Sequence, residues 1–298
     1  MKKIATAAVV AAAALWGVMG LFVRRLSAAG LGSLEIAQVR ITVGLLLLGA
    51  YLALFHREKL RVRLRDLWCF AGTGLLSLLL FSVCYFRTID LTSLAVAGVL
   101  LYTAPVFVMV FSIFLFRERL SARKLLALGM AVAGCALVSG VGSADALRPQ
   151  GVLLGLGAGF FYALYSIFGR YAIDRGYDSF TITFYTFLFC AAGAAFLSDW
   201  GKIGAAMAVP AVALNGVLMG LITGFASYLL YTWGLAYMES SRASILASVE
   251  PAVAAVAGIV IFHERLSAQV ALGVALVLGA VLVLSIHRHK AARTVNNP

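Results

Sequence analysis

The chain has 298 residues, of which 63% are hydrophobic and 12% are charged. A soluble globule of this length cannot bury so much apolar surface, so the composition excludes a soluble enzyme or binding protein and indicates a polytopic membrane protein. The net charge of +12 does not indicate nucleic-acid binding, because the basic residues gather in loops on one side of the predicted membrane spans.

A helix needs about 20 mainly apolar residues to cross about 30 Å of hydrocarbon. The first stretch that meets this test begins after Lys2 and Lys3, as a secretory signal does, but its apolar run is too long for a signal core, so we expect a spanning helix rather than a cleaved leader. In chain order the sequence predicts ten spans, at 4–23, 34–55, 67–87, 92–116, 122–141, 152–171, 180–198, 211–237, 241–262 and 267–286.

The second half of the chain repeats the first at a constant offset of 146 residues. We therefore predict a first repeat over 1–146 and a second over 147–298, the latter ending in a short cytoplasmic tail. Each repeat holds five predicted helices, and an odd number reverses the second copy across the membrane, as in many secondary transporters. Matching pairs include Trp16 with Tyr162, Gly30 with Gly176, Gly74 with Gly220 and Pro105 with Pro251, and the run ERLSA at 118–122 recurs at 264–268.

Basic residues are distributed unequally between the two sides of the membrane. Of the 24 Lys and Arg residues, Arg40 lies within a span, 17 lie on the side of the N-terminus and six lie on the other side. Because Lys and Arg are enriched in cytoplasmic loops, we expect both termini and the basic loop 57–66 to be cytoplasmic, in a plasma membrane that would be the bacterial inner membrane. The loop then faces anionic lipid rather than nucleic acid.

Several short motifs make the chain similar to a known family. They are Trp16-Gly17, Arg40, Pro105, Glu118-Arg119-Leu120, Glu250-Pro251 and Glu264-Arg265-Leu266. With these motifs and its two inverted halves, the chain resembles the EamA branch of the drug/metabolite transporter superfamily over essentially its whole length. The resemblance implies an all-α polytopic membrane protein of ten transmembrane helices in two inverted five-helix repeats, a central cavity and alternating access. It does not identify the solute, because members carry amino acids, amines, nucleotide-sugar-like compounds and drugs.

Glu250 is the acidic residue deepest in any predicted span. It lies nine residues into the segment 241–262, about 13 Å from the cytoplasmic end and hence near the midplane. A carboxylate there usually faces a cavity, pairs with a cation or relays protons, and desolvation favours its neutral form, so the group can titrate under cellular conditions. Its repeat partner is Ala104. We expect Glu250 to contact the solute or couple transport to protons; the alternative is a neutral acid that locks neighbouring helices together.

Arg40 is the other charge within a span, near the outer end of the segment 34–55. Its long side chain can snorkel to the surface or pair with Glu35 at the start of the same helix. Alternatively, Arg40 contacts a solute carboxylate or pairs with Glu250.

Pro105 and Pro251 interrupt helices at equivalent places in the two halves. Each lacks the amide that the helical ladder requires, so each can free carbonyl groups at mid-membrane. Such matched interruptions point to a transporter's binding site, while the alternative is a fixed kink that serves only packing.

Aromatic residues are numerous in the predicted spans. Those that lie deep could line a pocket for a flat or cationic solute through stacking or cation–π contact, with core packing as the alternative: Trp16, Tyr102 and Tyr162. Those nearer to helix ends are expected in the interfacial belt: Tyr85, Tyr231 and Trp233.

Small residues predict local packing and capping. Rows of glycines at four-residue spacing allow close approach of helices in lipid, or alternatively line a passage: Gly151, Gly155, Gly159, and Gly216, Gly220, Gly224. Ser121 and Ser267 are expected to cap the helices that follow them.

No feature of the sequence indicates an enzyme, a metal site or a cofactor. The chain has no phosphate-binding loop, the four cysteines are dispersed without CxxC spacing, and the histidines lie at helix ends or tails: His56, His263, His287 and His289. We expect a secondary transporter, an exporter, driven by a proton gradient or by the solute's own gradient. The expected solutes are small metabolites, with amino acids first and small amines or quaternary cations second.

Roles of other classes are a membrane-embedded enzyme acting on a lipid carrier and a purely structural or receptor protein. The first needs clustered carboxylates or histidines near one interface, and the second leaves Glu250 and the matched prolines unexplained. The expected partners are the solute and the lipid bilayer, with a monomer favoured over an obligate oligomer.

Overall fold

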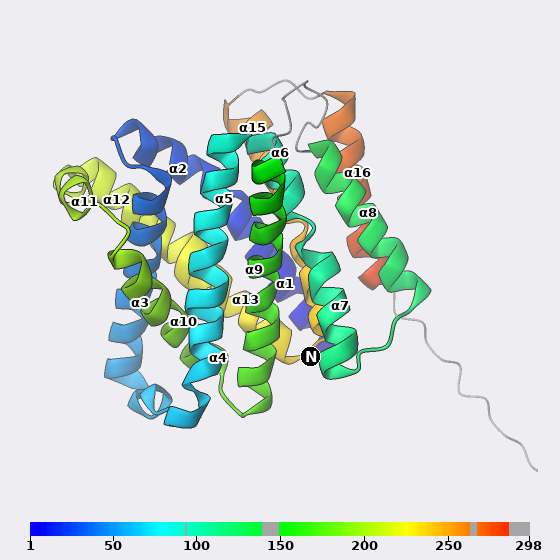
Figure 1. Cartoon of the computed structure of the whole chain (residues 1–298), viewed down its shortest axis with the longest axis horizontal. Helices are drawn as coiled ribbons and strands as arrows, with labels where there is room; N and C mark the ends of the chain where they lie inside the picture. The colour runs from blue at the N-terminus through cyan, green and yellow to red at the C-terminus, as the bar shows by residue number, and fades with distance from the viewer. Residues whose placement is uncertain (93, 139–148, 263–266, 286–298) are drawn as a thin grey trace, which may run out of the picture.

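The computed structural model describes residues 1–92, 94–138, 149–262 and 267–285, and this part of the chain is nearly all helical, without a β-strand. The helices lie in one bundle (Figure 1). Eight of them are long and apolar enough to cross a membrane, and Ser179–Ala195 together with Trp200–Met207, bent by 112°, makes a ninth if counted as one span. The predicted all-α polytopic fold is confirmed, while the described residues account for eight or nine of the ten predicted spans.

The helices of the first half follow the predicted segments, with breaks in two of them. Segment 4–23 is divided at Val18 and segment 92–116 at Tyr102–Thr103. The elements are α1 (Lys2–Gly17), α2 (Met19–Ala28), α3 (Ser33–Phe55), the short 3₁₀ turns η1 (Arg57–Leu60) and η2 (Leu64–Asp66), α4 (Leu67–Ala71), the π-helical η3 (Gly72–Leu79), α5 (Leu80–Leu91), α6 (Leu94–Leu101), α7 (Ala104–Phe116) and α8 (Ala122–Val138).

The second half shows a similar plan, with one additional short helix and without a counterpart of the break at Val18, since position 164 lies inside a continuous helix. Segment 241–262 is divided at Ser248–Val249, next to Pro251, just as the break before α7 lies next to Pro105. The elements are α9 (Pro149–Asp174), α10 (Ser179–Ala195), α11 (Trp200–Met207), α12 (Pro210–Met219), the π-helical η4 (Gly220–Ala226), α13 (Ser227–Ala236), α14 (Ser240–Ala247), α15 (Glu250–Phe262) and α16 (Ala268–Ser285).

The internal repeat appears in backbone details as well as in the sequence. Gly30 and Gly176, related by the 146-residue offset, both have φ of +87°. Each ends a helix in the left-handed conformation that glycine adopts without a steric penalty. The Gly30 amide donates to the Ser27 carbonyl at 2.9 Å, and the Gly176 amide donates to the Ile173 carbonyl, again 146 residues on, at 2.8 Å.

The π-helical segments η3 and η4 make equivalent contacts. A Cβ added at Gly74 would lie 2.6 Å from the carbonyl oxygen of Thr186, and a Cβ added at Gly220 would lie 3.2 Å from that of Arg40, which is 146 residues earlier. Both glycines therefore let two backbones approach closely. The glycine rows at 151–159 and 216–224 also pack closely against neighbouring helices. These contacts favour the first of the two predicted roles, close helix packing, over the lining of a passage.

Corresponding helices of the two halves run in opposite directions. At one end of the pair α3 and α10, Lys59 Nζ lies 2.7 Å from Asp178 Oδ2, and at the other end the Asp199 amide donates to Glu35 Oε1 at 3.3 Å. α8 and α16 lie side by side (Figure 1) and are also antiparallel. These pairs have the geometry predicted for inverted repeats.

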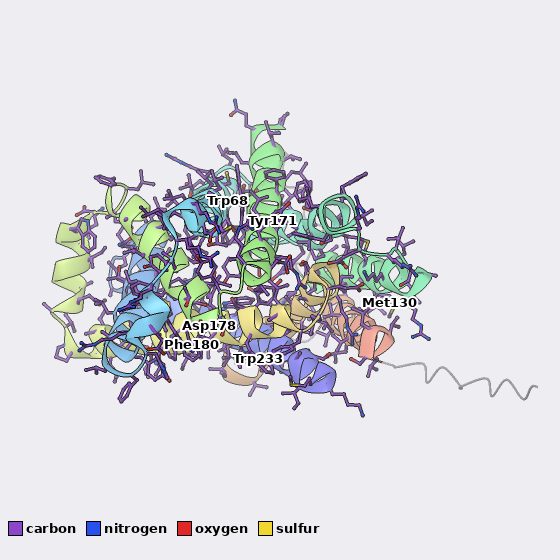
Figure 2. All side chains as sticks on the ribbon, turned by 90° about the horizontal axis from the view of Figure 1, so that it is seen from below. Trp68, Met130, Tyr171, Asp178, Phe180 and Trp233 are labelled. Atoms are coloured by element: carbon purple, nitrogen blue, oxygen red, sulfur yellow. The ribbon has the colours of Figure 1, made fainter. Side chains whose placement is uncertain are left out.

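The two ends of the bundle differ in the loops that they carry. The loop end holds the N-terminus and the segment 56–66, and in the view from that end Asp178 and Phe180 lie beside one another (Figure 2). There Phe180 also stacks on Tyr51, with ring centroids 5.5 Å apart. The opposite end holds the turn at 29–32 and the end of α5. We call these the loop end and the mouth end, because a cavity opens toward the second.

Candidate functional site

A cavity of about 120 Å³ lies inside the bundle between the two halves. It extends from the exposed Ser33, at the start of α3, down to the buried Trp16 and Tyr228. A single water needs roughly 10–15 Å³ of such space, so this cavity has room for a small solute or for several waters. Its lining comes from α1 to α3, α5, α6, α9, α12, α13 and α15.

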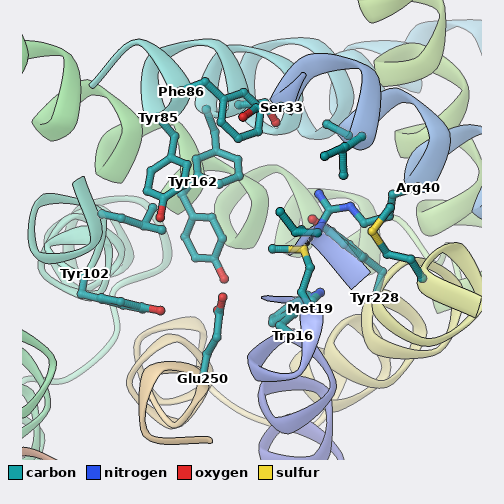
Figure 3. A pocket seen from close by; sticks show the side chains of 17 residues that line it. Trp16, Met19, Ser33, Arg40, Tyr85, Phe86, Tyr102, Tyr162, Tyr228 and Glu250 are labelled. Atoms are coloured by element: carbon teal, nitrogen blue, oxygen red, sulfur yellow. Dashed lines mark hydrogen bonds between the residues drawn. The ribbon is translucent and has the colours of Figure 1, made fainter. Parts of the chain in front are cut away.

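Glu250 faces this cavity from the first position of α15 (Figure 3). The helix is interrupted beside Pro251, as the sequence predicts, because it stops at Ala247 and restarts at Glu250. A negative charge at a helix N-terminus is favoured by the helix dipole. Among the described residues, no side chain forms an ion pair or hydrogen bond with the Glu250 carboxylate. The acid is therefore available to a solute or to water.

Close packing of α1 fixes where α15 begins. A Cβ added at Gly17 would lie 2.7 Å from the Glu250 carbonyl oxygen and 2.8 Å from the Cβ of Val253. Only a glycine fits this approach without a shift of one helix. The residue pair Trp16-Gly17 thus provides one aromatic wall of the cavity and, in the next position, the contact that places the acid.

Arg40 also lines the cavity, from α3, and its side chain is buried, with 7% of the residue exposed. Its Nη1 donates to Met19 Sδ at 2.9 Å, and its Nε has no hydrogen-bond partner among the described residues. The predicted snorkelling is therefore wrong. The alternative pairing with Glu35 is wrong as well, since Glu35 accepts from the Asp199 amide. A buried guanidinium with no carboxylate beside it is costly unless water or an anionic solute completes its shell.

Three phenol side chains surround the acid. Figure 3 shows Tyr85, Tyr102 and Tyr162 beside Glu250, with the hydroxyls of Tyr102 and Tyr162 directed toward its carboxylate. The interfacial position predicted for Tyr85 is wrong, because this residue lines the cavity and packs on Phe81 with ring centroids 5.7 Å apart.

The floor of the cavity is an aromatic layer. Trp16 contacts Tyr228 edge-on, with ring centroids 5.1 Å apart, and its Nε1 donates to the Thr223 carbonyl of η4 at 3.1 Å. Tyr231, predicted at the interface, is instead buried, and its hydroxyl bonds that of Ser166 at 2.7 Å. Below this layer the next cavity has only about 10 Å³, the space of one water. The path toward the loop end is closed.

The predicted prolines lie at the edges of the cavity rather than in it. Pro105 is in the first turn of α7 and Pro251 is the second residue of α15. The residues lining the cavity there lie in or directly after the breaks, Tyr102 on one side and Glu250 on the other. Each proline thus accompanies a helix break that brings a polar side chain to the site.

Several residues of the lining have no distinctive signal in the sequence. Met19 and Tyr228 carry no charge and lie on no matched proline break, so neither had a local signal. The spacing of Phe81 and Tyr85, four apart, does place both on one face of α5, and this spacing could have indicated their shared role.

Comparison with known proteins identifies the family. The model of the EamA-like transporter family matches the chain twice, over residues 3–140 and 149–286. The chain belongs to the EamA-like transporter family. The two matches cover the two halves defined by the 146-residue offset, and the resemblance stated from the motifs is confirmed. Members of this family have two repeats of five helices and are transporters, not enzymes.

Curated relatives of this EamA-like transporter carry the same general description. An uncharacterized transporter of Archaeoglobus fulgidus is 29% identical over 93% of this chain and 94% of its own length. The uncharacterized transporter YxxF of Bacillus subtilis is 25% identical over 98% of this chain and 92% of its own length. A solved crystal structure of a protein that is 21% identical has the same fold, with a TM-score of 0.79 over 94% of this chain and 96% of the other.

Proposed function

We propose that this transporter carries small zwitterionic metabolites, amino acids above all, by alternating access through the central cavity, and that it exports them. The observation that supports this most directly is the presence of two opposite charges, Arg40 and Glu250, in the lining of one small cavity. Neither charge has an ion-pair partner among the described residues.

An amino acid satisfies both charges at once. Its carboxylate fits the planar fork of the Arg40 guanidinium, which has a free Nε–H and only a weak sulfur acceptor. Its ammonium group fits the Glu250 carboxylate, with the neighbouring tyrosines providing hydroxyl groups and π faces. An apolar or aromatic side chain would then pack on Trp16 and Phe81, which favours the larger hydrophobic amino acids.

A small amine or quaternary cation is the second candidate. The acid among three tyrosines favours it, since a cation is stabilised by both a carboxylate and aromatic faces. Such a solute has no use for Arg40 and would be repelled by it. The two candidates therefore differ in their dependence on this arginine.

The test is counterflow in proteoliposomes, with radiolabelled amino acids and amines offered to the wild type and to Arg40→Gln, Glu250→Gln and Glu35→Gln. We expect exchange of amino acids, and each of the first two variants should lose affinity by about 10- to 100-fold, as for a hydrogen bond to a charged group. Glu35→Gln is the matched control, because it removes the same type of charge outside the cavity lining.

Two results would contradict the proposal. Unchanged affinity in both Arg40→Gln and Glu250→Gln would place the solute elsewhere. Loss in Glu250→Gln with gain in Arg40→Gln, together with amine exchange by the wild type, would establish the cation transporter instead. Repeating the assay over a range of pH also tests coupling, since Glu250→Gln cannot take up a proton and should remove any pH dependence that the acid provides.

A further inference from the structure

A polar cluster at the loop end ties together the two helices that are broken next to Pro105 and Pro251. It lies outside the cavity and consists of Glu118, Lys124, Glu239, Ser240 and Ser241, which we call the latch. Glu118 Oε1 accepts from the Ser240 amide at 2.7 Å, and Glu118 Oε2 accepts from the Ser241 hydroxyl. Lys124 Nζ lies 3.3 Å from Glu118 Oε2 and 2.8 Å from Glu239 Oε2.

The latch is shielded from solvent at its centre. The side chains of Glu118 and Lys124 are only 7% and 9% exposed. Charged hydrogen bonds are stronger than neutral ones and are strengthened further by burial. Arg170 of α9 joins the same region, because its guanidinium donates to the Met238 carbonyl and, at 3.4 Å, to the Ser240 hydroxyl. Three segments far apart in the chain thus meet at Ser240.

The backbone before Glu118 is shaped for this contact. Arg117 ends α7 in the left-handed conformation, with φ of 53°, and is the one non-glycine residue of the described chain with positive φ. Such a conformation is costly for a residue with a Cβ and persists where surrounding contacts require it. Here it turns the chain so that the Glu118 amide donates to the Ser112 carbonyl at 3.1 Å while the side chain reaches α14.

The latch joins the two helices that adjoin the breaks beside the cavity. α7 follows the break at Tyr102–Thr103, and α14 precedes the break at Ser248–Val249, so the latch holds α7 against α14 at the loop end. At the mouth end Tyr102 and Glu250 instead line the open cavity. Closure at one end and opening at the other thus involve one pair of broken helices.

The two repeats differ in the residues available for such a contact. The counterpart of Glu118 is Glu264, which lies outside the described residues. By the offset, the counterparts of Ser241 and Lys124 are Ala95 and Val270. The second repeat therefore keeps the acid in sequence but has neither the hydroxyl nor the ammonium group that Glu118 uses.

We propose that the latch is a one-sided gate: it holds the loop end closed, must open for the solute to pass, and biases the empty transporter toward the state that is open at the mouth end. This inference rests on the proposed alternating access, but it concerns the protein without solute. Its test is therefore independent of which solute is carried.

The experiment measures the reactivity of single cysteines in a background in which Cys69, Cys84, Cys135 and Cys190 are replaced. Ser244→Cys reports on the loop end, since Ser244 is buried in α14 one turn after Ser240. Ala37→Cys reports on the cavity that it lines. Purified protein is treated with N-ethylmaleimide without added solute, in the otherwise unchanged background and in Glu118→Gln, Lys124→Met and, as the matched control, Glu264→Gln.

We expect Glu118→Gln and Lys124→Met to speed labelling at position 244 by about tenfold or more, the factor for loss of one hydrogen bond to a charged group, and to slow labelling at position 37. Opposite changes at the two sites indicate a shift between two states, whereas general loosening would raise both rates. Glu264→Gln should leave both labelling rates within about twofold of those in the background, a change well below the tenfold effect expected for the latch variants.

The proposal is overturned if position 244 remains unreactive in both latch variants, if both sites become more reactive together, or if Glu264→Gln produces the same shift as Glu118→Gln. Ser241→Ala serves if either charged variant fails to fold, since it removes one hydrogen bond and no charge. The two proposals fail separately. If the protein does not transport amino acids, the proposed function is wrong, but the labelling rates expected here stay the same because they are measured without solute.

Discussion

Single charged residues show how strongly the surroundings determine what a side chain does. Arg40 is buried beside Met19, with its guanidinium facing the cavity, although its position in the sequence equally allowed it to reach the surface. Asp178, in contrast, lies at the edge of the bundle with 40% of its side chain exposed, and it pairs with Lys59 at 2.7 Å. It also caps α10, because Asp178 Oδ1 accepts from the Thr181 amide at 2.9 Å.

The environment of Asp178 predicts a pH effect on stability. Partial burial would by itself raise the pKa of the carboxyl, but hydrogen bonds from Lys59 and the Thr181 amide outweigh it, and the pKa lies below its ordinary value. A depressed folded-state pKa stabilises the fold above the unfolded value of about 3.9 and loses that effect as pH falls through the folded value. Asp178→Asn, which still caps the helix, should cost at most about 1 kcal/mol at pH 7, since the pair is partly exposed.

Thermal unfolding in detergent at several pH values measures this effect. The difference between Asp178→Asn and the wild type should shrink as the pH is lowered below about 4. Lys59→Gln should show the same dependence, and the double variant should lose little more than either single one. A difference that is independent of pH would mean that the ion pair contributes nothing to stability.

Among the structural elements, the breaks in the helices matter most for the site. The break at Ser248–Val249 turns a residue of mid-helix sequence into the first residue of α15, and the close contact with α1 holds that start in place. Gly17 permits the contact, while Gly20, one turn later on α2, has no atom within 4 Å of an added Cβ.

This contrast gives a paired prediction for Gly17→Ala and Gly20→Ala. The first should destabilise the protein by about 1–3 kcal/mol through overpacking and weaken solute binding, because α15 and Glu250 must move. The second should be neutral or stabilising by up to about 1 kcal/mol, from the better helix propensity of alanine. Melting temperature and counterflow affinity measure the two effects, and equal behaviour of the two variants would refute the role given to Gly17.

A feature of this arrangement could be predicted from the sequence when it depends on residues close together in the chain. The helix breaks at Pro105 and Pro251 and the helix caps at Ser121 and Ser267 can be predicted from the residues directly around them. Both serine hydroxyls accept a hydrogen bond from the amide three residues later. The inward direction of Arg40, the position of Tyr85 in the cavity lining and the burial of Tyr231 depend on which face of a helix points away from lipid, and a span that is apolar on every side does not indicate this face. The latch joins residues more than 120 positions apart, so no local pattern reveals it.

At the scale of the whole molecule, the inverted halves place the basic loops at one end of the bundle. The loop end carries the segment 56–66, the residues after α7 and those after α9, which hold most of the charges behind the predicted cytoplasmic orientation. If the loop end is inside, as predicted, the cavity of this structure faces outward and the proposed latch lies on the cytoplasmic side.

Orientation is tested with a single cysteine at position 61 in a cysteine-free background. Arg61→Cys should not react with a membrane-impermeant maleimide in intact cells and should react fully after permeabilisation, because Lys- and Arg-rich loops remain cytoplasmic. Lys202→Cys, between α10 and α12 at the mouth end, is the matched control and should react without permeabilisation. Labelling of position 61 in intact cells would contradict the predicted orientation and place the loop end outside.

The two charges of the cavity come from different halves: Arg40 has Thr186 as its repeat partner, and Glu250 has Ala104. If each half were a separate polypeptide assembling as an antiparallel homodimer, symmetry would require the same residue at 40 and 186 and the same residue at 104 and 250, so each charge would occur twice, once on either side of the two-fold axis. Joining the copies in one chain removes that requirement. Joining the halves in one chain thus permits a binding site with a single positive and a single negative pole, able to orient a dipolar molecule in one direction, whereas a symmetric dimer would present both poles twice.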